Sequence, residues 1–214
     1  MKSLISTIPD SIRSIFKLHP ETMADLPIFP LGSVLFPGGT MTLKIFEQRY
    51  LEMAKTCLKN RSPFGISLIR DGEEVGSPAV PEPVGTLAFI ADWDMPDLGI
   101  LQVRVIGAAR FRIIEQSVSR NGLIVGNVSM LPDDSHYDCA EHIECASFLA
   151  KIYAKVASTE MAQSGFEDAA WVGYRLTEFL PFNNAVKQKM LELTDARIRL
   201  EILYKFLTDQ RLIA

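Results

Sequence analysis

Residues 29–55 read FPLGSVLFPGGTMTLKIFEQRYLEMAK. The stretch starts with a strand-forming apolar segment, breaks at Pro37-Gly38-Gly39 and resumes as a second short strand over residues 40–45. From residue 47 to residue 60, apolar residues recur every three or four positions, as one buried helix face requires. The predicted order is strand, turn, strand and helix, and this order contains no recognisable catalytic motif.

Strand-forming segments separated by turn signals predict a β-rich first half. The expected strands cover residues 26–31, 40–45, 63–69, 84–93, 100–106, 111–118 and 123–130. Asn121-Gly122 suits the positive φ angles of a tight hairpin turn, and Gly107 predicts a bend between two hairpins. Residues 73–83 carry several prolines, which lack a backbone donor, so a loop is expected there.

After Pro132 the periodicity becomes helical, with helices expected over residues 138–158, 166–180, 183–191 and 195–207. Strands followed by helices predict an α+β fold. The predicted organisation is an N-terminal extension (residues 1–22), a β-rich subdomain (23–132) and a helical subdomain (133–214). Isoleucine spacing in the extension favours a short amphipathic helix, and a tail packed on the body is the alternative.

Composition narrows the class of protein. The chain has 214 residues, 48% of them hydrophobic, and a net charge of −4, which disfavours a nucleic-acid partner because phosphate affinity needs a basic excess. Strand alternation predicts that Arg104, Arg110 and Arg112 face solvent. Three cysteines are too few for a disulfide framework and indicate a reducing, cytoplasmic location. No apolar run reaches membrane-spanning length, and the N-terminus lacks the pattern of a signal peptide.

Two sequence blocks, PIFPLGSVLFPGGTMTLKIFEQRY at residues 27–50 and WVGYRLTEFLPFNNAVKQKMLEL at 171–193, resemble the Lon protease N-terminal, or substrate-binding, domain family. Residues 84–113 resemble the central strands of that family. The resemblance implies a PUA-like twisted β-barrel followed by a C-terminal all-helical bundle. No G-x-x-x-x-G-K-[ST] loop occurs in the sequence, and no protease domain is expected to follow. The expectation is a free-standing member without ATPase or protease domains, and not an enzyme.

The most metal-like pattern is H-x2-C-x2-H-x2-C, formed by His136, Cys139, His142 and Cys145. Zinc needs four converging ligands, whereas three-residue steps on a helix each turn about 300° and carry the outer two to opposite sides. Neither a metal nor a cofactor is therefore predicted.

Polar residues elsewhere favour structural roles. Asp92, Asp94 and Asp97 surround a turn, where carboxylates usually cap backbone donors or face water rather than catalyse. Phe36 to Gly39 is interpreted as a turn rather than an anion-binding loop. Glu47, Arg49 and Tyr50, which begin the helix, are also interpreted as structural.

The predicted partner-binding residues lie at one hairpin end: Trp93, Met95, Pro96 and Leu98. Exposed apolar residues at such a place either pack back or bind a partner. Packing against the helical half is the favoured interpretation, and a binding contact is the runner-up.

The predicted function is that of a non-enzymatic module that binds unfolded or hydrophobic polypeptide segments. Its surface is expected in an apolar groove between the two halves, with the hairpin end contributing. A role as an adaptor for protein quality control, alongside a separate protease or chaperone, follows from the resemblance. The alternatives are an RNA- or nucleotide-binding PUA-like protein and a small-ligand-binding protein.

Overall fold

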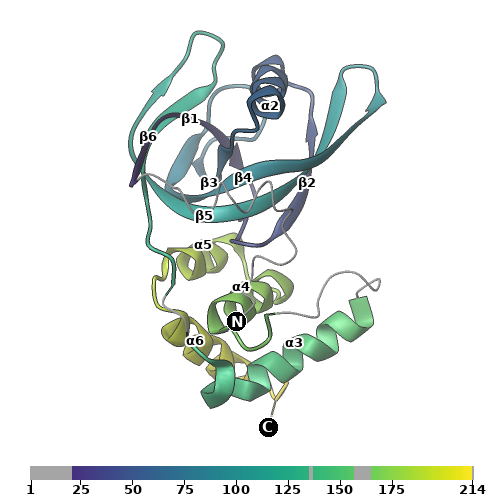
Figure 1. Ribbon diagram of the computed structural model, residues 1–214, viewed down its shortest axis with the longest axis vertical. Helices are drawn as coiled ribbons and strands as arrows, with labels where there is room; N and C mark the ends of the chain where they lie inside the picture. The colour runs from purple at the N-terminus through teal and green to yellow at the C-terminus, as the bar shows by residue number, and fades with distance from the viewer. Residues whose placement is uncertain (1–20, 135–136, 157–164, 214) are drawn as a thin grey trace. The chain divides into compact units, whose positions relative to one another are not determined.

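The computed structural model describes residues 21–134, 137–156 and 165–213. They fall into two compact units that meet between Pro132 and Asp133 in the sequence. We call residues 21–132 the barrel unit and the described residues from 133 onward the helical unit, and each is described by itself (Figure 1). Strands followed by helices confirm the predicted α+β fold class.

The barrel unit is a mixed six-stranded sheet that closes on itself. Its strands are β1 (Thr22–Leu31), β2 (Thr40–Ile45), β3 (Phe64–Asp71), β4 (Val80–Asp97), β5 (Ile100–Val118) and β6 (Ile124–Met130). They follow the order β2-β5-β4-β3-β1-β6, and β5 also pairs with β6. The β5–β6 pairing joins the two ends of the five-strand run β5-β4-β3-β1-β6. The first half of β5 also pairs with β2, which lies outside this closed run.

The first strand is longer than predicted. β1 starts at Thr22 rather than Leu26, pairs in parallel with β3 and antiparallel with β6, and has a register shift between Met23 and Leu26. Asp25, inside that irregularity, has a φ of 54°. The helix predicted within the N-terminal extension lies outside the described residues.

β5 is one continuous strand, so the predicted strands over residues 100–106 and 111–118 are joined, and a register shift against β4 lies next to Gly107, where a bend was predicted. Gly107 is also the point where the Pro37-Gly38-Gly39 turn approaches β5. Gly38 donates its amide proton to the Gly107 carbonyl, and Gly107 donates to the Gly39 carbonyl, both at 2.8 Å. A Cβ on Gly107 would lie 2.2 Å from the Phe36 carbonyl oxygen, so only glycine fits.

The predicted loop over residues 73–83 is also partly wrong, because β4 begins at Val80 and includes Pro81 and Pro83. Pairing of β4 with β5 begins only at Val84, whereas β3 already pairs at Val80 and Pro81. The prolines therefore lie where β4 has a neighbour on one side only, a position that tolerates a missing donor.

Arg110 is the exception among the three strand arginines that were predicted to face solvent. Arg104 and Arg112 are exposed, but Arg110 is buried. It pairs across the sheet with Thr86, which is also buried, and its guanidinium donates to the Pro132 carbonyl at 2.9 Å. A register shift between Thr86 and Ala88 changes the phase of the alternation at this point.

Helix α2 (Gln48–Asn60) covers one face of the sheet and completes the core of the barrel unit. Its N-cap is Glu47, and it ends at Arg61, which has the left-handed conformation of a helix C-terminus. The core that α2 shares with the strands includes Phe29, Leu43, Ile45, Tyr50, Met53, Ala54, Cys57, Val103 and Val105.

The residues that begin α2 have structural roles. The Arg49 guanidinium pairs with Glu47 at 2.9 Å and donates to the Gly122 carbonyl at 3.0 Å, which ties α2 to the β5–β6 turn. Asn121 donates to the Glu52 carboxylate from the same turn. The Tyr50 ring stacks on Phe29 with centroids 3.9 Å apart, and burial raises the pKa of Tyr50.

The helical unit contains a short 3-10 helix, η2 (Cys139–His142), followed by α3 (Ile143–Val156), α4 (Ala169–Phe179), α5 (Asn184–Glu192) and α6 (Ala196–Asp209). Side chains of Asp168, Asn183 and Asp195 accept backbone N–H bonds at the starts of α4, α5 and α6. None of the helices in the described ranges is long and apolar enough to cross a membrane.

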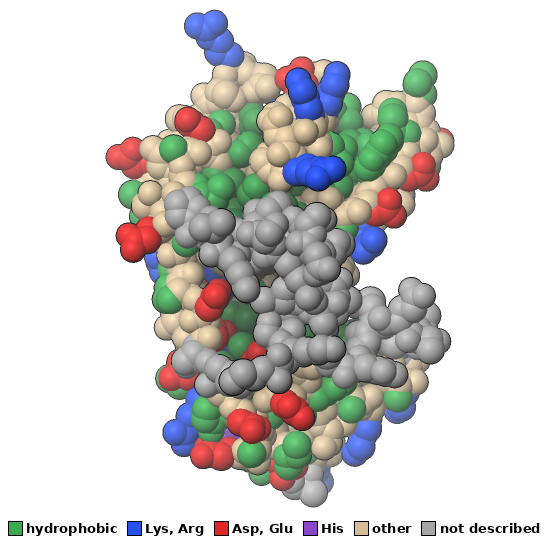
Figure 2. Space-filling model, in the orientation of Figure 1, with side chains coloured by type: hydrophobic (Ala, Val, Ile, Leu, Met, Phe, Trp, Pro, Cys, Tyr) green, Lys and Arg blue, Asp and Glu red, His purple; other side chains and the backbone are tan. Residues whose placement is uncertain are grey.

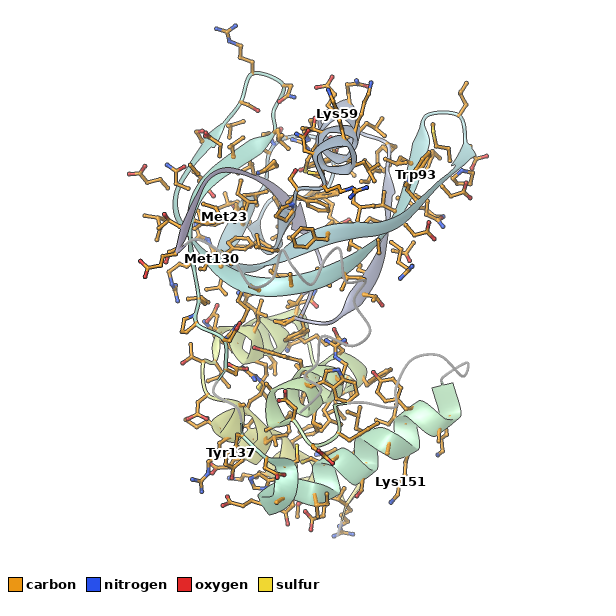
Figure 3. All side chains as sticks on the ribbon, viewed as in Figure 1. Met23, Lys59, Trp93, Met130, Tyr137 and Lys151 are labelled. Carbon is orange, nitrogen blue, oxygen red and sulfur yellow. The ribbon has the colours of Figure 1, made fainter. Side chains whose placement is uncertain are left out.

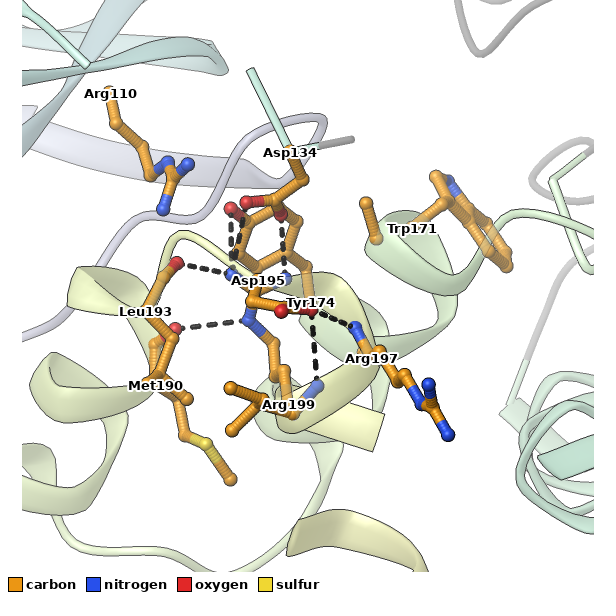
Figure 4. A network of polar contacts seen from close by, with 12 residues as sticks. Arg110, Asp134, Trp171, Tyr174, Met190, Leu193, Asp195, Arg197 and Arg199 are labelled. Carbon is orange, nitrogen blue, oxygen red and sulfur yellow. Dashed lines mark hydrogen bonds and ion pairs between the residues drawn. The ribbon is translucent and has the colours of Figure 1, made fainter. Parts of the chain in front are cut away.

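A buried arginine organises this unit (Figure 4). Arg199 on α6 is fully buried and pairs with Asp134 at 2.7 Å. It also donates to the Met190 carbonyl at 3.1 Å, the Leu193 carbonyl at 2.6 Å and the Tyr174 hydroxyl at 3.2 Å. These contacts tie α4, the end of α5 and the chain before η2 to α6.

Candidate functional site

Four predicted site residues lie together at the projecting end of the β4–β5 hairpin: Trp93, Met95, Pro96 and Leu98. We call this group the tip patch. Trp93 and Met95 are each 55% exposed, Leu98 is fully exposed, and Pro96 is exposed as well. Figure 3 labels Trp93 at this end of the barrel unit. Gly99, with a φ of 84°, turns the chain from β4 into β5.

A bulge in β4 sets the face of the strand on which Trp93 lies. Ile90 pairs with Val105, but after one extra residue Asp92 pairs with Arg104 and Trp93 with Val103. The one-residue shift exchanges the two faces of the strand. Trp93 therefore lies on the same face of the sheet as the buried core residue Val103. Its exposed apolar side chain continues that face beyond the buried core.

One apolar residue at the same end was missed by the sequence predictions. Phe46 is 54% exposed and directly follows Ile45, which pairs with Leu101 at the start of β5. The sequence signal for Phe46 is the alternation of apolar and polar residues in β2, where Leu43 and Ile45 are buried and Lys44 is exposed. Continuing that alternation turns Phe46 outward.

On the face of the barrel unit shown in Figure 2, hydrophobic side chains gather between α2 and the β4–β5 hairpin. Lysines and arginines lie over α2 itself, and Lys55, Lys59 and Arg61 are exposed there. The exposed apolar area on this face is thus bordered by charge on the side of α2.

Two of the three tip carboxylates cap backbone donors. Asp92 accepts from the amide of Trp93 at 2.9 Å, and Asp94 accepts from the amide of Met95 at 2.8 Å. Asp97 pairs across the turn with Ile100 and is exposed. The arrangement fits the capping role predicted for such carboxylates.

The histidine–cysteine pattern belongs to a packed region of the helical unit. Cys139 and Cys145 are buried free thiols, and burial raises the pKa of each to about 12. His142 lies against Tyr204, with ring centroids 5.2 Å apart, and His136 lies outside the described residues. Over the described ranges, no three His, Cys, Asp or Glu side chains are grouped as metal ligands.

A protein-family model matches nearly the whole of both units. The family model described as the ATP-dependent protease La (LON) substrate-binding domain matches residues 25–209. The chain belongs to the Lon substrate-binding domain family. This confirms the family predicted from the two sequence blocks, and the matched region is the substrate-binding domain rather than an ATPase or protease domain.

Solved structures give the Lon substrate-binding fold directly. The chain is similar to the crystal structure of a Lon N-terminal domain protein from Xanthomonas campestris, with 38% identity and a TM-score of 0.72 over 85% of this chain and 97% of that one. The N-terminal domain of the Mycobacterium avium complex Lon protease shares the fold, with a TM-score of 0.65 and 15% identity over 86% of this chain and 98% of that chain.

Two full Lon proteases are similar over the same region. Identity is 26% to the Lon protease of Anaeromyxobacter dehalogenans (strain 2CP-C), covering 88% of this chain and 23% of that protein. It is also 26% to Lon protease 2 of Myxococcus xanthus, covering 98% of this chain and 26% of that protein. The chain thus spans about a quarter of the length of the curated relatives it matches.

Proposed function

We propose that this Lon substrate-binding domain recognises exposed apolar segments of unfolded polypeptides through the tip patch. The observation that supports this most strongly is the exposure of Trp93, Met95 and Leu98 at one hairpin end. Large apolar side chains gathered on a surface mark interaction sites, and Trp and Met suit contacts that must adapt to varied partners.

The membership of the family supports a polypeptide as the partner class. We propose further that the bound segment is passed to a separate protease or chaperone, so that the chain acts as an adaptor in protein quality control. Three buried free thiols are compatible with work in the reducing cytoplasm. The apolar groove predicted between the two halves stays a prediction.

The test is binding of the full chain to fluorescent peptides of graded hydrophobicity, measured by anisotropy. Replacing both Trp93→Ala and Leu98→Ala should weaken binding of apolar peptides by more than about tenfold, because such anchors supply most of the contact energy. Little change is expected for acidic, non-apolar peptides.

The matched control replaces Ile114→Ala and Val118→Ala, which are 60% and 57% exposed in the same unit. Their removal should leave peptide affinity unchanged. If both double variants lose affinity equally, or neither does, the tip patch is not the recognition surface.

A further inference from the structure

The tip of β4 has an open edge. Pairing between β3 and β4 ends at the Phe64–Ala88 pair, and β5 is the remaining partner strand of β4 from Ile90 to Asp97 over the described residues. The side chains from Trp93 to Asp97 are exposed. An open strand edge presents backbone donors and acceptors to any second strand that reaches it.

The backbone groups of Trp93 point toward this edge. Gly107 exchanges hydrogen bonds with Gly38 and Gly39, on the β2 side of β5. Because bonding direction alternates along a strand, Val103 also turns its backbone groups toward β2. Trp93 pairs with Val103, so this is a pair without mutual hydrogen bonds, and the N–H and C=O of Trp93 face away from β5.

The two carboxylates beside the tip patch occupy these outward donors. Asp92 accepts from the Trp93 amide and Asp94 from the Met95 amide, so two donors of the hairpin end are covered by side chains of their own strand. Charged residues on an edge are a common protection against unwanted strand pairing.

We propose that the open edge of β4 from Trp93 to Asp97 is a strand-addition site, at which an extended polypeptide segment pairs with the backbone and displaces Asp92 and Asp94 from its amides. This inference rests on the proposed function and specifies how the segment is held. Backbone pairing tolerates many sequences, which suits a module that binds unfolded chains. Trp93 and Met95 then contact alternate apolar side chains of the added strand.

Charge complementarity defines the segment further. Asp92, Asp94 and Asp97 all lie along this edge, whereas Arg104, opposite Asp92, can offset one of them. A carboxylate displaced from an amide remains beside the added strand. The favoured occupant is therefore an extended apolar segment that also carries lysine or arginine.

The experiment uses the full chain and a short peptide in which Val and Lys alternate, with binding measured by anisotropy. Two further peptides carry backbone N-methyl groups, one on every Val and one on every Lys. An added strand turns only alternate N–H groups toward β4. One methylated peptide should therefore bind about tenfold more weakly, while the other binds like the parent.

Two variants of the protein test the same backbone hydrogen bonding between β4 and the peptide. Met95→Pro removes the N–H that Asp94 covers, whereas Met95→Ala removes only the side chain. Met95→Pro should bind the parent peptide about tenfold more weakly than Met95→Ala does, with circular dichroism of both unchanged.

Equal binding of all three peptides, or equal loss by both methylated ones, would overturn strand addition, even if Met95→Pro failed to fold. The proposed function would survive that result as long as Trp93→Ala with Leu98→Ala still weakened binding. Sedimentation of the chain as a dimer that Met95→Pro dissociates would identify a second copy as the occupant and overturn the polypeptide assigned here.

Discussion

Arg199 and Arg197 stand two positions apart on α6 and have opposite surroundings. Arg199 is fully buried with Asp134, Tyr174 and two backbone carbonyls around its guanidinium. Arg197 is about half exposed and pairs with Glu141 and Glu201, each at 3.3 Å. A buried charge depends on its partner far more than an exposed one does.

Asp134→Ala should lower the free energy of unfolding by about 3–5 kcal/mol, because it leaves the Arg199 charge buried without its carboxylate. Urea denaturation followed by circular dichroism measures the change. Arg197→Ala is the matched control and should cost less than about 1 kcal/mol, since exposed ion pairs contribute little. Equal losses in the two variants would mean that the buried network does not stabilise the unit.

The sequence gives no sign of this difference between the arginines. Residues 196–207 read ARIRLEILYKFL, in which both arginines fit the polar positions of an ordinary helix. The partners of Arg199 come from Asp134, far away in the chain, and from carbonyls at the end of α5. Only the tertiary structure brings them together.

At the scale of elements, β5 shows which structural features the residue pattern of a strand predicts and which it does not. Both hairpins that use β5 were predicted, as was the Asn121-Gly122 turn, where Gly122 has a φ of 84°. The need for glycine at Gly107 comes from Phe36, a contact that the local residue pattern does not report. The bulge after Ile90 is likewise set by pairing across strands, which periodicity along one strand does not report.

Gly107→Ala should destabilise the barrel unit by about 2 kcal/mol or more, because its Cβ would lie 2.2 Å from the Phe36 carbonyl oxygen and the turn would have to move. Thermal unfolding measured by circular dichroism provides the readout.

Gly126→Ala is the control within the same barrel. The nearest atom to its Cβ would be 3.5 Å away, an ordinary contact, so stability should change little or rise. A Gly107→Ala variant as stable as Gly126→Ala would show that the approach of the Phe36–Gly39 turn to β5 is not tight.

At the scale of the whole molecule, element order carried the prediction of the family, since the two sequence blocks fall in separate units and the matched residues 25–209 include both. The tip patch was found because hairpin ends can be located from turn residues. Its orientation and the missed Phe46 depend on register, which the sequence specifies only through the partners in the folded sheet.

Cysteine reactivity reports on both units at once, because Cys57 lies in the barrel unit and Cys139 and Cys145 in the helical unit. Burial raises the pKa of all three thiols, and for the last two it reaches about 12. The native chain should react with Ellman's reagent only on unfolding, and the denatured chain should expose all three thiols.

The same shifts give a pH dependence. Between the ordinary thiol pKa near 9 and the native value of about 12, the unfolded chain has lost thiol protons that the folded chain retains. Stability should therefore fall as pH rises through this range. A Cys139→Ser, Cys145→Ser variant should show a shallower decline, and rapid stoichiometric labelling of the native chain would contradict the burial of these thiols.

The pairing of β1 with β6 has a consequence for synthesis on the ribosome. The first strand lies between β3 and β6, and β6 ends at Met130, so the barrel closes only after more than half of the chain has been made. Until then β1 has an unpaired side. Such long-range closure is slow and leaves nascent strands open to mispairing. A protein of this topology therefore needs protection from wrong strand pairing while it is translated.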